Sequence, residues 1–302
     1  MYHNYDMNKI LEDLRSDSKK NLILDTDTYN EIDDQFAIAY AMRCPESIEL
    51  LSINAAPFLN SRSTDPGDGM EKSYHEIFNI MHLTDPAAKI PVYRGSTAFL
   101  TDKKTPVESE AANNIINTVL AAEEPIYVVA IGAITNVASA IIKCPEICSK
   151  MTVIWLGGHA LHWPNTREFN LRQDVAAAQV VFDSKVPLAL IPCNGVCNFL
   201  ATSVPELQYY LGGKNELCDY LVKIVAAYTS KPYAWSKVIW DVSAIALLTV
   251  PEALETVILP TPVLTDDCYF ANDTARHPFI YVRYLKRDVI FAHLFKKLAG
   301  EA

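Results

Sequence analysis

The sequence predicts an α/β fold, with an open, mostly parallel twisted sheet, helices on both faces and a helical C-terminal part. Apolar segments such as 126–131 and 152–156 show no alternation with polar residues, which is typical of strands buried on both faces. Segments with helical periodicity separate these strands, and strands that alternate with helices indicate a parallel sheet. Polar clusters follow several strands, as expected of ligand-binding loops at the carboxyl edge of such a sheet.

Each predicted strand is an apolar run, and each predicted helix has a helical apolar pattern or a capping residue at its start. The predicted strands are 22–24, 48–53, 90–93, 126–131, 152–156, 187–191, 257–264 and 279–284. The predicted helices are 34–42, 70–83, 108–122, one capped at Thr135-Asn136, one opened by Asp174, a mainly helical stretch over 203–248, and 289–298.

Composition limits the class of protein. The 302 residues contain no Pro/Gly/Ser-rich linker, so we expect one domain over 1–302 with an N-terminal extension at 1–20. Half of the residues are hydrophobic, which predicts a globular protein with a sizeable core. The net charge of −10 argues against a nucleic-acid partner, which needs a basic face.

The N-terminal stretch and the cysteines bear on location. Residues 1–20 are charged and lack the apolar core of a signal peptide, and no apolar run is long enough to span a membrane. We therefore expect no membrane partner. Seven cysteines are an odd number for a full disulfide framework, and no histidine or further cysteine pair completes a zinc pattern. Ordinary thiols in a reducing compartment, and hence a cytoplasmic location, are the expectation.

An acidic cluster follows the first predicted strand. Five acidic side chains fall within the ten residues 25–34, in the sequence DTDTYNEIDD. Like charges at such density are costly unless a cation neutralises them, and carboxylates suit a hard divalent ion such as Ca²⁺ or Mg²⁺. The alternative is a solvated acidic loop with a helix cap.

Four polar elements follow predicted strands, and together they resemble one family. The elements are 25–34, 54–60, 132–136 and 157–170. The chain resembles the inosine-uridine-preferring nucleoside hydrolases over 21–298, with the family's motifs in the same order. The family's DTDPG-x-DD is present as DTDTYNEIDD, two residues longer and without Pro-Gly. GxLTN is present as GAITN (132–136), AEFN as REFN (167–170), and HDP as WDV (240–242).

The resemblance implies hydrolysis of the N-glycosidic bond of a ribonucleoside to free base and ribose. It also implies a Ca²⁺ held by Asp27, Asp34, the carbonyl of Thr135 and Asp241. Such oxygen ligands, drawn from distant parts of a chain, are what Ca²⁺ accepts. Relatives are dimers or tetramers, so a homo-oligomer is expected.

The resemblance also assigns the substrate contacts. Asp27 would take a proton from the attacking water, and Asp33 would bind ribose hydroxyls. Glu168 and Asn170 would hold the 3′ and 5′ sides of the sugar, and Asn60 is the best match to an asparagine after the second strand.

Two departures concern the leaving base. Trp240 stands where the inosine-uridine-preferring members have a histidine, and 95–108 lacks the histidine of some members. Purine-selective relatives sandwich the purine between tryptophans, and an aromatic face attracts a cationic ring, so Trp240 predicts a purine or modified-purine substrate. Tyr228, thirteen residues before Asp241, matches a family tyrosine near the base. His162 replaces an asparagine six residues before Glu168, and would contact the 5′ side or transfer a proton.

Simpler alternatives remain for each of these residues. Thr135-Asn136 would serve only as a helix cap, Glu168 and Asn170 as surface-loop residues, Trp240 as core, and His162 as an exposed histidine. Asp241 is harder to explain in this way, because a carboxylate inside the apolar helical segment VIWDVSAIALL needs a cation or donors.

Parts of the sequence also fit two other functions. LILDTDT (22–28) matches the DxDxT opening of haloacid-dehalogenase-type phosphatases, although the later lysine and acidic motifs are missing. A non-catalytic nucleoside- or ribose-binding relative is the other alternative, but a pure binder would not need Asp27.

Overall fold

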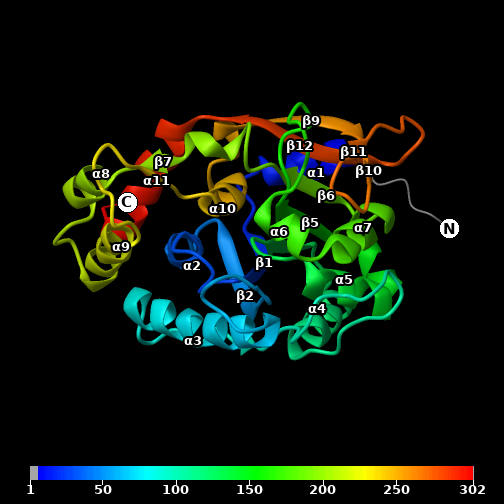
Figure 1. Cartoon of the computed structure of the whole chain (residues 1–302), viewed down its shortest axis with the longest axis horizontal. Coiled ribbons are helices and arrows are strands. Elements are labelled where there is room, and N and C mark those ends of the chain that lie inside the picture. Colours follow the sequence, from blue (N-terminus) through cyan, green and yellow to red (C-terminus); the bar gives the residue numbers. More distant parts are fainter. Residues whose placement is uncertain (1–5, 302) are drawn as a thin grey trace.

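An eight-stranded sheet runs through the centre of the molecule, whose computed structural model describes residues 6–301 (Figure 1). In spatial order the strands are β3 (Val92–Tyr93), β2 (Ile48–Ala55), β1 (Lys20–Thr26), β4 (Ile126–Ala130), β5 (Met151–Leu156), β6 (Leu188–Ile191), β12 (Pro278–Leu285) and β9 (Leu254–Pro260). All neighbours pair in parallel except β12 with β9. The mostly parallel sheet is thus confirmed.

Helices cover both faces of the sheet. Successive strand residues point to opposite sides, so a strand that is apolar throughout places apolar side chains on both faces. In β1, Leu22 and Leu24 belong to one hydrophobic core and Ile23 to the other. The first core includes residues of α1 (Met7–Leu14), α2 (Asp34–Met42), α3 (Pro66–Thr84), α8 (Val204–Tyr210), α9 (Glu216–Ala227), α10 (Val242–Thr249) and α11 (Arg287–Ala299). The second includes residues of α4 (Glu110–Ala121), α5 (Thr135–Lys143), α6 (Phe169–Gln173) and α7 (Val175–Asp183).

Short elements complete the chain. They are the pairs β7 (Ala201–Thr202) with β8 (Lys237–Val238) and β10 (Val263–Leu264) with β11 (Phe270–Ala271), and the 3-10 helices η1 (Pro145–Ser149), η2 (Cys197–Phe199) and η3 (Pro251–Ala253). No helix within residues 6–301 combines the length and the apolar character needed to cross a membrane.

The predicted N-terminal extension contains helix α1, and its residues 1–5 lie outside the described part. Two local predictions are corrected. The stretch 203–248 is interrupted by β8, so α10 begins only at Val242. Asp241 therefore occupies the N-cap position of α10 and not its interior.

The predicted cap of α5 is also wrong, for a reason that matters to the site. Ile134 is the N-cap residue, and it makes no side-chain capping bond. The Thr135 hydroxyl donates to Asp174 (2.7 Å), and the Asn136 amide donates to Asp25 (2.8 Å). These fully buried bonds join the loops at the carboxyl edge of the sheet, which positions the cleft described next.

Candidate active site

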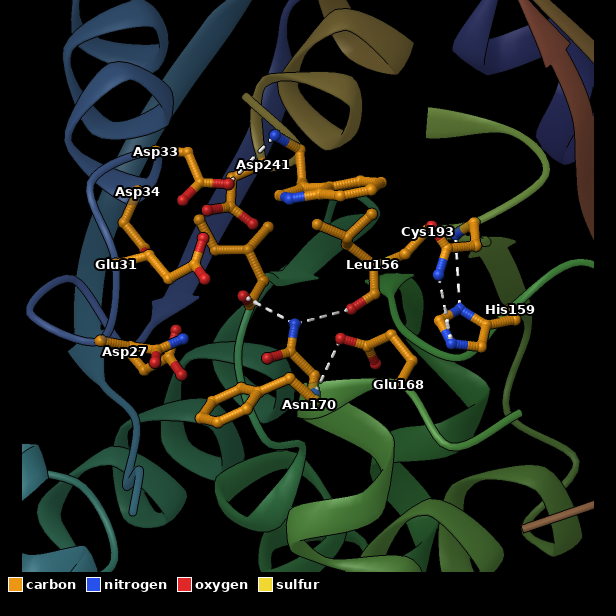
Figure 2. A pocket seen from close by; sticks show the side chains of 15 residues that line it. Asp27, Glu31, Asp33, Asp34, Leu156, His159, Glu168, Asn170, Cys193 and Asp241 are labelled. Carbon is orange, nitrogen blue, oxygen red and sulfur yellow. Dashed lines mark hydrogen bonds between the residues drawn. The ribbon is translucent and has the colours of Figure 1, made fainter. Parts of the chain in front are cut away.

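The carboxyl ends of β1, β4, β5 and β6 surround a cleft with a volume of about 220 Å³ (Figure 2). Six carboxylates line it: Asp27, Glu31, Asp33, Asp34, Glu168 and Asp241. The other lining residues are Asn30, Ile131, Leu156, His159, Phe169, Asn170, Cys193, Asn194 and Trp240. The cleft is thus acidic, with two aromatic side chains and no lysine or arginine among its lining residues.

Four aspartates from two distant segments gather on one side of this cleft. Asp27 directly follows β1, Asp33 and Asp34 begin α2, and Asp241 precedes α10. One oxygen each from Asp33, Asp34 and Asp241 lies within 4.8 Å of the others. The N-termini of α2 and α10 favour negative charge there. Even so, burial, and then the neighbouring carboxylates, raise the pKa of Asp27 and of Asp241 well above the ordinary range.

Asp27 has no partner for either carboxylate oxygen among the described residues, although the residue is only 1 % exposed. Gly132 lies against it so closely that a Cβ at that position would be 3.0 Å from the Asp27 Cγ. A buried carboxylate without donors needs a cation or a bound hydroxyl. The set of hard oxygen donors formed by Asp27, Asp34 and Asp241 fits Ca²⁺ or Mg²⁺.

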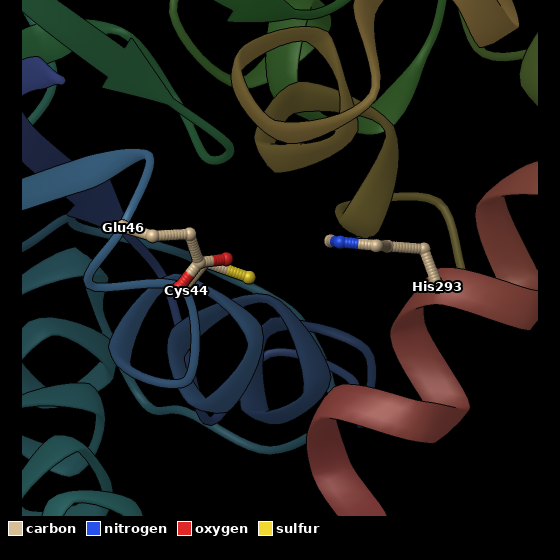
Figure 3. A group of neighbouring side chains, drawn as sticks. All are labelled: Cys44, Glu46 and His293. Atoms are coloured by element: carbon tan, nitrogen blue, oxygen red, sulfur yellow. The ribbon is translucent and has the colours of Figure 1, made fainter. Parts of the chain in front are cut away.

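A second cluster of metal-binding residue types shows the contrast. Cys44, Glu46 and His293 face one another between the end of α2 and α11 (Figure 3). Here the protein itself supplies partners: Lys297 is 2.8 Å from the Glu46 carboxylate, and the Tyr40 hydroxyl is 2.6 Å from His293 Nδ1. These bonds connect the two helices and need no ion, unlike the Asp27 carboxylate.

Glu168 and Asn170 also line the cleft and are buried, so their alternative as surface-loop residues is wrong. Glu168 accepts hydrogen bonds from the backbone N–H groups of Gly158 (2.9 Å) and Leu171 (3.0 Å). Burial nevertheless raises the pKa of Glu168. Asn170 Nδ2 donates to the carbonyls of Ile131 (3.0 Å) and Leu156 (3.1 Å), which ties β4 to β5. Because both N–H groups are used, Asn170 offers a substrate only its amide oxygen, as an acceptor.

Asp33 is held in place by the segment before α10. Its carboxylate accepts a hydrogen bond from the Trp240 backbone N–H (3.0 Å) and lies 3.6 Å from Lys237 Nζ. Lys237, 7 % exposed, also forms an ion pair with Glu31. Trp240 lines the cleft beside them and is only partly buried, so it is not simply a core residue.

Two predicted site residues, Asn60 and Thr135, are not among the residues that line the cleft. Asn60 Nδ2 donates to Asn30 Oδ1 (2.7 Å) and thereby holds a lining residue. The Thr135 side chain is turned toward Asp174. The metal contact assigned to Thr135 is its backbone carbonyl, and that assignment stays a prediction.

His162 and Tyr228 also lie outside the lining. The His162 side chain is exposed, and its ring lies next to Gly195. A Cβ atom added to Gly195 would be 3.2 Å from the His162 ring. This is the arrangement expected of an ordinary loop histidine, so the geometry does not support the role assigned to it. Tyr228 is 41 % exposed, stacks with Trp235, and has Lys237 Nζ 5.1 Å from its ring centroid. It is linked to the cleft through Lys237, which pairs with the lining residue Glu31.

Sequence reasoning missed several lining residues. Cys193 and Asn194 follow β6, so the rule that sites lie at the carboxyl ends of strands could have found them. His159, only three residues from His162, lines the cleft, and its ring nitrogens lie 3.4 Å from backbone and side-chain nitrogens of Asn194. The loop holding the two histidines has no periodicity that could distinguish them. Lys237 gave no signal in the sequence.

Comparisons with known proteins bear on the family and on the fold. Residues 22–277 match the family described as inosine-uridine preferring nucleoside hydrolase. Non-specific ribonucleoside hydrolases RihC are similar in sequence. The protein from Salmonella agona is 26 % identical, over 84 % of this chain and 86 % of its own length. That from Escherichia coli is 26 % identical, over 76 % and 79 % respectively.

Solved structures share the fold. A purine-preferring ribonucleoside hydrolase from Gardnerella vaginalis aligns with a TM-score of 0.78 at 20 % identity, covering 93 % of this chain and 99 % of that one. An inosine-guanosine nucleoside hydrolase aligns with a TM-score of 0.74 at 19 % identity, with the same coverage.

Proposed function

We propose that this chain, which belongs to the inosine-uridine preferring nucleoside hydrolase family and is a nucleoside hydrolase, acts with a bound Ca²⁺ and prefers purine or modified-purine ribonucleosides. The observation that carries the Ca²⁺ proposal is the Asp27 carboxylate, buried and without a partner beside Asp34 and Asp241. Asp27, Asp34, Asp241 and the Thr135 carbonyl would hold the ion. The family match over 22–277 excludes the phosphatase alternative.

In the proposed mechanism, Asp27 accepts the proton of the water that attacks the anomeric carbon. A divalent cation, when bound, lowers the pKa of a coordinated water and neutralises part of the acidic cluster. Asp33, fixed by the Trp240 backbone and Lys237, binds ribose hydroxyls. Glu168 and the Asn170 oxygen bind the far side of the sugar. Carboxylates around the sugar stabilise the positive charge of an oxocarbenium-like transition state.

The proposed base preference rests on Trp240. It lines the cleft at the position where the family pattern has a histidine, so it offers an aromatic surface and no proton. A large, flat purine would gain more from such a surface than uracil would. The protein from Gardnerella vaginalis, which has the same fold, is purine-preferring, whereas the RihC relatives are non-specific. The similar proteins therefore include both a purine-preferring and a non-specific hydrolase.

Two further expectations belong to this proposal. Seven buried, unpaired cysteines fit a reducing compartment, which supports a cytoplasmic location. A homodimer or homotetramer is proposed from the resemblance alone.

The test is release of free base from inosine, guanosine, adenosine, uridine and modified purine nucleosides, followed by chromatography with Ca²⁺ present. Purine release that is lost with a chelator and with Asp27→Ala would support the proposal. Faster turnover of uridine or cytidine than of all purines would contradict the base preference, and full activity in chelator would contradict the Ca²⁺ dependence.

A further inference from the structure

The charge of the cleft is far from balanced. Six carboxylates line it, and among the described residues the only ammonium in contact with them is that of Lys237, which pairs with Glu31 and Asp33 from behind the lining. A neutral base gains nothing in binding from this excess of carboxylates over cationic groups, whereas a base that carries a positive charge is attracted to it.

The cleft is also poorly equipped to protonate a leaving base. Trp240 carries no acidic proton for this purpose. His159 is the one histidine of the lining, and burial lowers its pKa, so it is neutral at pH 7. In Figure 2 it lies beside Cys193 and Glu168, across the cleft from Glu31, Asp33 and Asp34. A neutral purine would therefore have to leave without strong help from a general acid.

Both features suit a base that already carries a positive charge. We propose, building on the proposed hydrolase function, that this cleft takes ribonucleosides with a cationic base, namely pyridinium or N-alkylpurinium ribosides. Water oxygen bonds to the anomeric carbon as the bond from that carbon to the base nitrogen breaks. The bonding electron pair stays on the nitrogen, so the base leaves neutral and needs no proton. The water proton passes to Asp27 and then to solvent.

Glu31 and Trp240 supply the recognition in this proposal. Glu31 lines the cleft, and its side chain is 36 % exposed. Its ion pair with Lys237 holds the carboxylate in place, and the exposed part of the side chain remains accessible to a ligand. Trp240 lines the same cleft, and an aromatic face attracts a cation. Glu31 is therefore a specificity-determining residue of this chain.

The test compares ligands of equal shape and different charge. Nicotinamide riboside carries a pyridinium, and benzamide riboside is its neutral, carbon-linked counterpart. Each competes with inosine hydrolysis, which gives an inhibition constant for both. We expect nicotinamide riboside to bind about tenfold more tightly, in the range of a cation–π contact with an added ion-pair contact. Base release from nicotinamide riboside and 7-methylguanosine is measured in parallel and divided by the uncatalysed rate.

Glu31→Gln and a matched control identify the source of the preference. Glu31→Gln should weaken binding of nicotinamide riboside about three- to tenfold and leave benzamide riboside unchanged. Glu124→Gln makes the same substitution at an exposed position before β4, at the opposite edge of the sheet, and should change neither.

The outcomes separate the two proposals. Hydrolysis of neutral purines with equal binding of the charged and neutral ribosides overturns the cationic-base proposal and leaves the hydrolase function intact. The same proposal fails if the pyridinium is bound preferentially but never hydrolysed. Release of base from no nucleoside of either class contradicts the proposed function itself.

Discussion

Replacing Asp27 with asparagine is expected to have opposite effects on activity and on stability in a chelator. Neither oxygen of the buried Asp27 carboxylate has a partner, and Asp33 and Asp34 repel it. A buried polar group without a partner costs about 1–3 kcal/mol. Asparagine removes the charge and brings N–H donors next to carboxylates. We therefore expect the free energy of unfolding in chelator to rise by about 1–3 kcal/mol while base release is abolished.

Ca²⁺ should reduce this difference in stability. A ligand that binds only the folded protein stabilises it by about 2.7 kcal/mol at a concentration of 100 times its dissociation constant. Wild type should gain this amount, and Asp27→Asn should gain less because one carboxylate ligand is missing. Thermal unfolding in EDTA and in excess Ca²⁺ measures both effects, at roughly 2–4 °C per kcal/mol.

The matched control is Asp17→Asn, which removes the same charge from an exposed position. It should leave activity and both melting temperatures unchanged. The reasoning is refuted if Asp27→Asn is less stable than wild type in EDTA, or if both proteins gain equally from Ca²⁺.

Three further predictions concern other residues. Trp240→Ala should slow purine nucleosides more than an activated aryl riboside, since only the former need help with the leaving group; equal slowing in steady-state kinetics would remove Trp240 from that role. His162→Gln should keep kcat/KM within about twofold of wild type, because His162 is exposed. His159→Gln should raise KM. A larger loss of kcat/KM in His162→Gln than in His159→Gln would place His162 in the site. Burial, and then Arg276, lower the pKa of His277 to about 4. The folded state thus binds fewer protons than the unfolded state between these pH values. Wild type should therefore lose stability relative to His277→Gln as the pH falls from about 6.5 toward 4. Urea titrations across this range measure the difference in the free energy of unfolding, and a difference that stays constant would contradict the prediction.

Local pattern was enough to predict the framework. The helix predicted at 34–42 is observed as Asp34–Met42, because its apolar residues and its acidic start are contained in its own sequence. The strands predicted at 126–131 and 152–156 behave in the same way, since each is an apolar run bounded by polar residues. The strand predicted at 257–264 is wrong: that stretch is divided between β9 (Leu254–Pro260) and β10 (Val263–Leu264), which belong to different sheets. Asp27, Asp33 and Asp34 lie together because they share one loop directly after β1.

Residues whose role depends on a distant partner could not be predicted in this way. Asn136 does not cap its helix, because its amide finds a buried acceptor in Asp25, 111 positions away. Lys237 is buried because Glu31, 206 positions away, pairs with it. The family motif and the apolar surroundings of Asp241 predict its place near the acidic cluster, and one of its oxygens lies within 4.8 Å of oxygens of Asp33 and Asp34. The predicted helical stretch before it is too long, because the two residues of β8 are too few to leave a strand pattern in the sequence.

The longer acidic loop and the segment with Trp240, which both differ from the family motifs, are in contact with each other. The acidic loop is two residues longer than the family pattern and contains Glu31, and the segment with Trp240 in place of histidine contains Lys237. Lys237 contacts Glu31 and Asp33, and the Trp240 backbone donates to Asp33, so the altered loop and the altered segment hold each other. Lys237 keeps Asp33 as a carboxylate partner if Glu31 is replaced, so the buried ammonium is not left unpaired. Trp240, which stands where the family pattern has a histidine, thus shares the cleft with a carboxylate that Lys237 holds in place, and the proposed recognition of a cationic base rests on this arrangement.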